Sequence, residues 1–224
     1  MTQCFTLDAG ATITGVGTGN CGDQGWLYVP GCGSGPGEGL GYLATDIGFY
    51  LSAGGGHGGA GSVECDYLQT SICANGGAAN DDPIHPCFMG SGGSMADAPW
   101  TGSPPGSSGG GLLKIVVLNG STNVLASATV NGTIDMSGYM GMGQSFHHAG
   151  GGAGGTVLIE ADSVLGTGVL RANGGNGGPG AGGGGGIISL IENLSTFGGS
   201  ISVMGGNSGN PGIVTFTPSP VSGY

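Results

Sequence analysis

The segment GVLRANGGNGGPGAGGGGGIISL, residues 168–190, connects two short apolar segments through a run, residues 173–186, in which ten of fourteen residues are glycine. Connections within compact domains are usually about 4–6 residues long. Ordering the backbone of one residue costs on the order of 1–2 kcal/mol, and glycine loses the most freedom. We therefore expect this run to be ordered only where similar segments, or a neighbouring subunit, pack against it.

Apolar segments like the two flanking ones recur through the second half of the chain. They are rich in Val and Ile and too short for helices, which favours β-strands. The four segments are LLKIVVL (112–118), TVLIE (156–160), IISLIE (187–192) and IVTFT (213–217).

A weaker pattern follows each of the first three segments: an apolar residue, three small or turn residues, and a second apolar residue. It spans residues 130–134, 165–169 and 197–201. Taking Val130, Leu165 and Phe197 as equivalent gives a nearly constant spacing, which is that of a solenoid coil. We predict an all-β fold, a parallel β-helix (β-solenoid) whose coils each contain three short strands and a long glycine-rich excursion.

The excursions, residues 149–155, 173–186 and 204–212, then leave the same corner of successive coils. Chains of glycine can adopt the extended polyproline II conformation, which has three residues per turn. Without side chains, neighbouring backbones come close enough to hydrogen-bond laterally. We therefore predict that the excursions are polyglycine-II-like.

Residues 1–110 have a similar composition but a less regular pattern. WLYVP (26–30) and DIGFYLSAGGG (46–56) are typical of strands that end in turns, and WTGSPPGSSGGG (100–111) is typical of a surface excursion. We divide the chain into a cysteine-bearing, glycine-rich β region, residues 1–110, and the solenoid repeats, residues 111–224. A single continuous domain is the alternative.

Charge and hydropathy exclude several classes of function. Only 7% of residues are charged, the net charge is -11, and Lys114 and Arg171 are the only basic residues. We expect no nucleic-acid partner, because phosphate binding needs several Lys or Arg side chains. No apolar run approaches the roughly 20 residues of a membrane span, so we expect no membrane insertion. The start, MTQCFTLDAG, lacks signal-peptide features, and we expect a mature or excised part of a longer protein.

Six cysteines lie in the first half of the chain: Cys4, Cys21, Cys32, Cys65, Cys73 and Cys87. An even number of scattered cysteines in a charge-poor, glycine-rich region favours three disulfides and an oxidising compartment. Fifteen pairings of six cysteines exist, and the spacing does not choose among them. A metal site is the alternative, but the chain has no C-x-x-C motif, and His85 is the only histidine near these cysteines.

Three asparagines stand in N-glycosylation sequons, namely Asn119, Asn131 and Asn193. A Ser-, Thr- and Asn-rich chain contains about this many by chance, so the sequons alone do not establish glycosylation. Asn119 is the best candidate for a covalent glycan, because it lies in the turn-like NGSTN. Asn131 has the alternative role of a turn residue at a coil corner.

Three groups of ionisable residues are candidates for metal or acid–base chemistry. They are Asp81, Asp82 and His85; His147 and His148; and Glu160, Asp162 and Glu192. DDPIHP (81–86) is more typical of a rigid, solvated loop, and adjacent histidines on a strand point to opposite faces. The acidic residues of the third group form no cluster with a base. We expect no catalytic residue, no metal and no cofactor.

The segment GGGAGGTVLIEADSVLGTGVLRANGGNGGPGAGGGGGIISLI (150–191) resembles the repeats of large glycine-rich extracellular proteins with pectin-lyase-like, right-handed parallel β-helices. The resemblance covers residues 111–217 well and residues 1–110 loosely. It implies a structural or adhesive role at a cell surface, and it carries no catalytic motif onto any position of this chain.

These observations favour a non-enzymatic, extracellular structural protein that self-assembles into a fibre, filament or surface appendage. Glycine excursions and methionines are the candidate contacts between subunits: Gly178, Gly180, Gly182, Gly183, Gly184, Met140 and Met142. The last predicted strand also lacks the charges that usually protect an open edge. The first alternative is an adhesin or carbohydrate-binding tip, and the second is an ice-binding protein, although only Thr215 and Thr217 form a T-x-T pair. A polysaccharide lyase is the last alternative, because pectin lyases combine acidic clusters with a basic residue.

Overall fold

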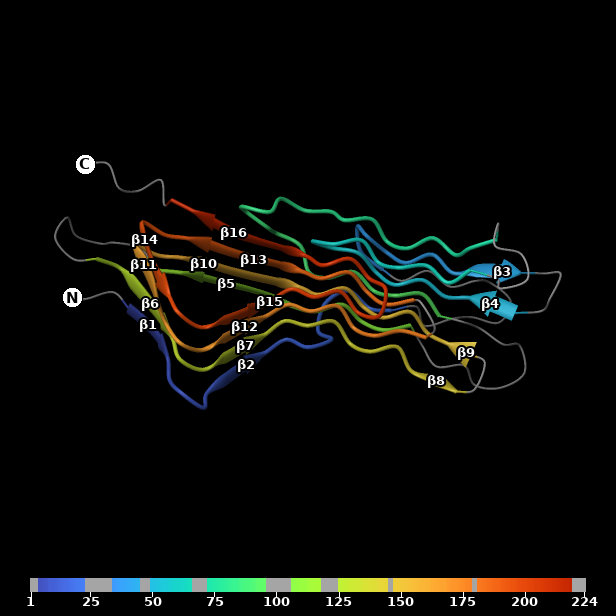
Figure 1. Cartoon of the computed structure of the whole chain (residues 1–224), viewed down its shortest axis with the longest axis horizontal. Helices are drawn as coiled ribbons and strands as arrows, with labels where there is room; N and C mark the ends of the chain where they lie inside the picture. Colours follow the sequence, from blue (N-terminus) through green and yellow to red (C-terminus); the bar gives the residue numbers. More distant parts are fainter. Residues whose placement is uncertain are drawn as a thin grey trace.

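The computed structural model describes residues 4–22, 34–44, 49–65, 72–95, 106–117, 125–144, 147–178 and 181–218. Every regular element within these ranges is a β-strand, and twelve strands form three parallel, four-stranded sheets (Figure 1). The first sheet contains β1 (Cys4–Leu7), β6 (Ser127–Val130), β11 (Ser163–Gly166) and β14 (Leu194–Phe197). The second contains β2 (Thr12–Thr14), β7 (Thr133–Asp135), β12 (Val169–Arg171) and β15 (Ser200–Ser202). The third contains β5 (Leu112–Val116), β10 (Thr156–Glu160), β13 (Ile187–Ile191) and β16 (Ile213–Thr217).

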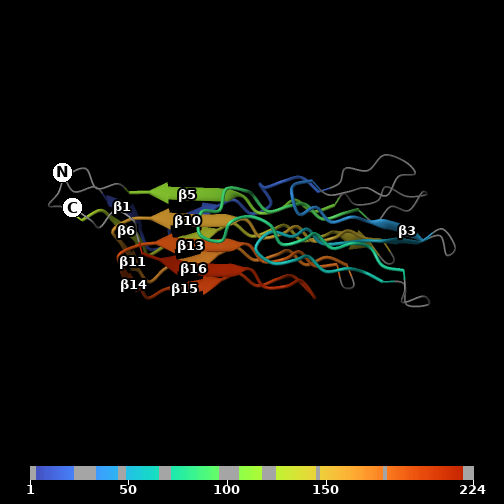
Figure 2. The same ribbon diagram turned by 90° about the horizontal axis from the view of Figure 1, so that it is seen from above.

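One strand from each sheet makes a rung, and the four rungs are stacked in chain order (Figure 2). The rungs are β1–β2–β5, β6–β7–β10, β11–β12–β13 and β14–β15–β16. In every rung the glycine-rich excursion leaves after the second-sheet strand and returns at the third-sheet strand. The predicted parallel β-solenoid with glycine-rich excursions is therefore confirmed.

The register differs from the predicted one by one residue in the third rung. Leu165 pairs with Thr129 and Thr196, not with Val130 and Phe197. Gly166 occupies the predicted position of Leu165 and pairs with Phe197. Its φ is +113°, and it lies so close to the Val130 carbonyl that a Cβ would overlap the carbonyl oxygen. The predicted register places apolar residues on one another, whereas the close approach of two backbones selects glycine here.

Interior side chains form columns that run through the rungs. In the third sheet, Ile115, Ile159, Leu190 and Phe216 occupy one column. Ile159 and Leu190 of the middle rungs are completely buried, and they belong to one apolar cluster that unites all three sheets. Burying one side chain of this size contributes about 1.5–3 kcal/mol to stability. Most of these buried apolar side chains belong to the short strands, so the core lies mainly between the three sheets.

The excursions pack side by side into a bundle that extends from one side of the solenoid (Figures 1 and 2). Residues 150–155 donate amide hydrogen bonds to three neighbours in rotation: Gly150 and Ala153 to Ser94 and Ser91, Gly151 and Gly154 to Ala181 and Gly184, and Gly152 and Gly155 to Tyr139 and Met136. A period of three residues is that of the polyproline II helix. The predicted polyglycine-II-like excursions are thereby confirmed.

Steric exclusion explains why the bundle needs glycine. A Cβ at Gly151 would overlap the carbonyl oxygen of Gly175, and a Cβ at Gly183 would overlap that of Gly152. Each segment is held by hydrogen bonds to segments far away in the sequence, such as the bond from the Gly184 amide to Gly55. Neighbouring excursions of the same chain therefore hold the long glycine run in place.

The first rung joins the two predicted regions into one unit. Its strands β1 and β2 come from residues 4–14 and pair with β6 and β7, whereas its third strand is β5. The excursion between them, residues 15–111, is far longer than the others and supplies much of the bundle. It includes the hairpin of β3 (Tyr42–Ala44) and β4 (Phe49–Leu51), and β4 lies within the predicted strand segment 46–56. WLYVP (26–30) lies outside the described residues.

A second hairpin, β8 (Gly143–Gln144) with β9 (His147–His148), belongs to the second excursion. Both hairpins lie at the end of the bundle that is farthest from the solenoid and from the two chain termini (Figure 1). The described residues contain no helix long and apolar enough to cross a bilayer.

Candidate functional site

The C-terminal end of the solenoid is an uncovered cross-section of the apolar core. Phe216 continues the interior column above Leu190, but it is 55% exposed whereas Leu190 is 0% exposed. Val214, Phe197 and Ile201 of the same rung are also only partly buried. Within the described residues, no strand pairs with the outer edge of β14, β15 or β16. This surface therefore combines open hydrogen-bonding edges with exposed core side chains.

Charge does not protect this end. The strands β14, β15 and β16 contain no charged residue and no proline. Natural proteins usually protect open edges with charged side chains, prolines or a covering segment. The ion pair of Arg171 Nη1 with Asp135 Oδ2, 3.0 Å apart, lies on the two middle rungs and leaves the end unprotected.

The outer face of the third sheet, by contrast, is covered by residues 81–88, here called the strap. Hydroxyl groups of the sheet donate to carbonyl oxygens of this segment: Thr215 to Pro83, Ser189 to Ile84, and Thr156 to Phe88. The strap thereby buries both faces of β10 and β13. It also covers Thr215, one of the two threonines of the T-x-T pair that an ice-binding array would use.

Asp81 organises the strap from within. Its carboxylate accepts hydrogen bonds from the amides of Asp82, Cys87 and Phe88, at 2.8–3.1 Å, and its backbone has a φ of 82°. Burial raises the pKa of Asp81, but these amides and His57 together hold it below its ordinary value. Asp82 in turn accepts from the amides of His85 and Ile84, which lowers the pKa of its carboxyl group. The prediction of a rigid loop at DDPIHP is consistent with these bonds.

His57 connects the strap to the glycine bundle. Its side chain is completely buried, with Nδ1 2.9 Å from the carbonyl oxygen of Gly154 and Nε2 3.2 Å from Asp81 Oδ2. Both partners are oxygen acceptors, so His57 lies between two groups that can each accept a hydrogen bond from its ring. The sequence analysis did not single out His57. The available signal was a lone large polar residue inside the run GGGHGG (54–59).

Cys87 lies beside this pair, with its Sγ 3.6 Å from Asp81 Oδ1. Desolvation and the negative charges of Asp81 and Asp82 raise the pKa of the Cys87 thiol. A thiol with a raised pKa is a poor nucleophile, because the thiolate is the reactive form. The contacts among His57, Asp81 and Cys87 hold the strap in place. No group of three or more metal-ligating side chains occurs among the described residues.

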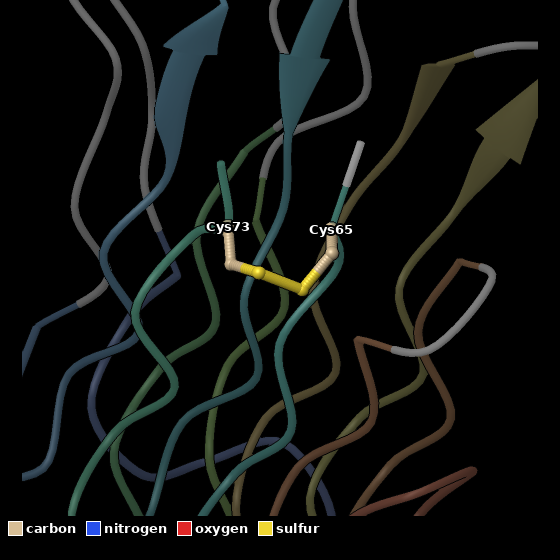
Figure 3. Close-up of a disulfide and its surroundings, with 2 residues drawn as sticks. All are labelled: Cys65 and Cys73. Atoms are coloured by element: carbon tan, nitrogen blue, oxygen red, sulfur yellow. A yellow bond between two sulfur atoms is a disulfide. The ribbon is translucent and has the colours of Figure 1, made fainter. Parts of the chain in front are cut away.

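The structure pairs two of the six cysteines. Cys65 and Cys73 form a disulfide between neighbouring segments of the first excursion (Figure 3). Cys4, Cys21 and Cys87 are free and exposed, so the prediction that all six cysteines pair in three disulfides does not agree with this structure. Cys32 lies outside the described residues. The spacing of the cysteines could not choose the pair, because the two cysteines meet only after the excursion folds back on itself.

Two of the three predicted glycosylation sites, Asn131 and Asn193, lie between strands of the solenoid. Asn131 and Asn193 are both exposed, and Asn131 Oδ1 accepts a hydrogen bond from the Thr167 amide of the next rung. Asn131 therefore serves as a corner residue. Asn119 lies outside the described residues.

The candidate assembly contacts separate into two sets. Gly182, Gly183 and Gly184 are buried inside the chain, so another subunit cannot reach them without unfolding the bundle. Gly178 is half-buried, and Gly180 lies outside the described residues. Met140 and Met142 are 60% and 57% exposed on the side of the bundle and remain available for a lateral contact.

No family model, no curated protein and no solved structure matches this chain.

Proposed function

We propose that this chain is a non-enzymatic, extracellular structural protein that self-assembles into a filament or surface appendage. The observation that carries the proposal is the uncharged end of the solenoid, where Phe216 is exposed at the top of a core column. Exposed apolar surface that is continuous with a core is typical of surfaces that bind another protein.

Two further properties support this assignment. The Cys65–Cys73 disulfide is typical of proteins that fold in an oxidising compartment. The bundle is built from backbone hydrogen bonds between glycine segments, which provides a stiff body with few reactive side chains. The ionisable cluster at His57 and Asp81 is used to hold the strap.

Sedimentation and negative-stain microscopy of the purified chain over a range of concentrations test the proposal. We expect oligomers that grow with concentration, and native mass spectrometry of the same samples reports any covalent glycan. Dispersed monomers at the highest concentration would contradict self-assembly.

An adhesive tip is the second candidate function. It is favoured by one observation: two hairpins, β3–β4 and β8–β9, lie together at the end of the bundle farthest from the termini (Figure 1), and Tyr42 is 45% exposed there. A glycan array tests this candidate. Absence of binding to any glycan, with the fold intact, would remove the carbohydrate-binding form of it.

A further inference from the structure

Each end of the solenoid exposes one strand from each of the three sheets. At the N-terminal end the outermost strands are β1, β2 and β5, and at the C-terminal end they are β14, β15 and β16. Each sheet is parallel throughout, and each end strand has one edge that pairs with no other described strand. A parallel stack can be continued by adding a rung in the same orientation, because the edges at its two ends are complementary.

The end rungs also match in size. The strands β1 and β14 have 4 residues each, β2 and β15 have 3 each, and β5 and β16 have 5 each. The first rung of a second copy therefore has strands of the right lengths to be added to the first copy as a fifth rung. The inner rungs have the same lengths, because all four strands of each sheet contain the same number of residues.

The interior columns match as well. Continuing the observed register would place Ile115 of the second copy on Phe216, and Leu113 on Val214. In the second sheet the same rule would place Ile13 on Ile201. Each contact would join two apolar side chains. Ile115 is already buried, and the exposed Phe216 and the partly buried Leu113, Ile13, Val214 and Ile201 would become interior.

Charge does not oppose this contact. Lys114 is the only charged residue in the six end strands, and it is an exposed residue of β5. In the continued register it would lie level with Thr215, where no second positive charge is present. Figure 2 shows the two ends on opposite sides of the molecule, with the glycine bundle extending sideways from the stack. A second copy placed on one end therefore lies alongside the bundle and not across it.

We propose that copies of this chain associate head to tail, with β14, β15 and β16 of one copy pairing in register with β1, β2 and β5 of the next. The inference rests on the proposed self-assembly and names its partner, a second copy, and its contact. The two patches differ, so the interface is heterologous and repeats without closing. Four rungs per copy at about 4.8 Å each give an axial repeat of roughly 19 Å.

End-blocked variants test the contact. Phe216→Lys blocks the C-terminal end at a position that is already 55% exposed, and Leu113→Lys blocks the N-terminal end at a half-buried position. We expect either variant alone to be monomeric, and an equimolar mixture to form dimers and nothing larger, because one free end of each kind remains. Circular dichroism and thermal unfolding establish that each variant is folded.

Met140→Lys is the matched control, since Met140 is 60% exposed but lies on the bundle and away from both ends. We expect it to assemble like the unmodified chain. Loss of assembly in Met140→Lys but not in Phe216→Lys would overturn the head-to-tail contact in favour of a lateral one, while self-assembly itself would stand. Dimers formed by Phe216→Lys alone would also overturn it, since they require two like ends to meet. If the unmodified chain never assembles, the proposed function fails before the contact is reached.

Cross-linking gives a second measurement that does not depend on the fold of Leu113→Lys. In a chain with Cys4, Cys21, Cys32 and Cys87 changed to Ser, Val116→Cys and Thr217→Cys are level with each other in the proposed register. A short bis-maleimide should then link copies into ladders. The control replaces Thr217→Cys by Ser202→Cys, which lies on the last rung in a different sheet. Equal linking of both pairs would overturn the register.

Discussion

His57 is completely buried although glycines surround it on both sides in the sequence. The bundle is otherwise closed to large side chains, because most of its glycines face a backbone oxygen at the position of a Cβ. His57 is accommodated because its two ring nitrogens contact Gly154 and Asp81, which joins three segments distant in the sequence. A single polar side chain thus couples the bundle to the strap over the third sheet.

We expect His57→Ala to lower the free energy of unfolding by about 1–3 kcal/mol, because it removes the hydrogen bonds of the buried ring with the Gly154 carbonyl and the Asp81 carboxylate. His85→Ala is the matched control, because His85 belongs to the same strap but is exposed, and its change should stay within about 0.5 kcal/mol. Urea unfolding measures both. Similar losses for the two variants would contradict the assigned role of His57.

Asp81 should also make stability depend on pH. Its pKa in the folded chain lies below the ordinary value of 3.8, so its contribution is fully present above the unfolded value and is lost as pH falls through the folded one. We therefore expect acid to destabilise the unmodified chain, and Asp81→Asn to lose less stability over the same range. Urea unfolding from neutral pH to below pH 3.8 tests this. The exposed Glu38→Gln should not reduce the acid sensitivity to the same degree.

The glycine-rich segments of the bundle, such as residues 150–155, are neither helices nor strands, but they have a repeating hydrogen-bond pattern of their own. Their hydrogen bonds rotate among three neighbours every three residues, so each segment needs several others before it becomes stable. The strands are the opposite case, because β10 and β13 bury apolar side chains on both faces. The rungs hold the excursions next to one another, and hydrogen bonds between the excursions satisfy their backbone groups.

Glycine at the bundle centre is therefore a steric requirement. We expect Gly183→Ala to cost about 1–3 kcal/mol of stability through overpacking, since its Cβ would overlap the Gly152 carbonyl. At Gly198, a Cβ would meet only the Gly166 carbonyl oxygen, at 3.9 Å, and Gly198→Ala should change stability by less than about 0.5 kcal/mol. Thermal unfolding compares the two. Equal changes in stability for Gly183→Ala and Gly198→Ala would contradict the tight packing of the bundle.

The Cys65–Cys73 disulfide closes a short loop in the first excursion, with a sequence separation of 8. We expect Cys65→Ser with Cys73→Ser to lower stability by about 2–3 kcal/mol, because the unfolded chain gains the entropy of the opened loop. Peptide mapping without reductant should recover the Cys65–Cys73 pair. Cys4→Ser is the control, since Cys4 is free and its loss should leave stability nearly unchanged.

The described residues form an elongated body with a solenoid at one end, a glycine bundle, and two hairpins at the other end (Figure 1). The net charge of the chain is -11, and all of its acidic residues lie outside the end strands, whose one charged residue is Lys114. The ends can therefore meet through apolar contacts, while the bodies of two copies repel each other.

This distribution predicts how salt affects assembly. Salt screens the repulsion between the bodies, with a Debye length of about 10 Å at 0.1 M, and leaves the apolar end contact intact. We expect added salt to lower the concentration at which oligomers appear in light scattering. Weakening of assembly by salt would instead indicate a contact made by opposite charges.

The strands and the glycine conformation follow from the sequence alone. Segments such as TVLIE and IISLIE are too short and too β-branched for helices, and consecutive glycines without side chains favour extended, laterally bonded chains. These preferences are local, so a pattern in the sequence can reveal them. Only the tertiary structure decided the one-residue register at Gly166, the inclusion of residues 4–14 in the first rung, the Cys65–Cys73 pair and the contact of His57 with Asp81. Each of these depends on which distant backbones lie next to each other, and that choice is made by the packing of the rungs and excursions together.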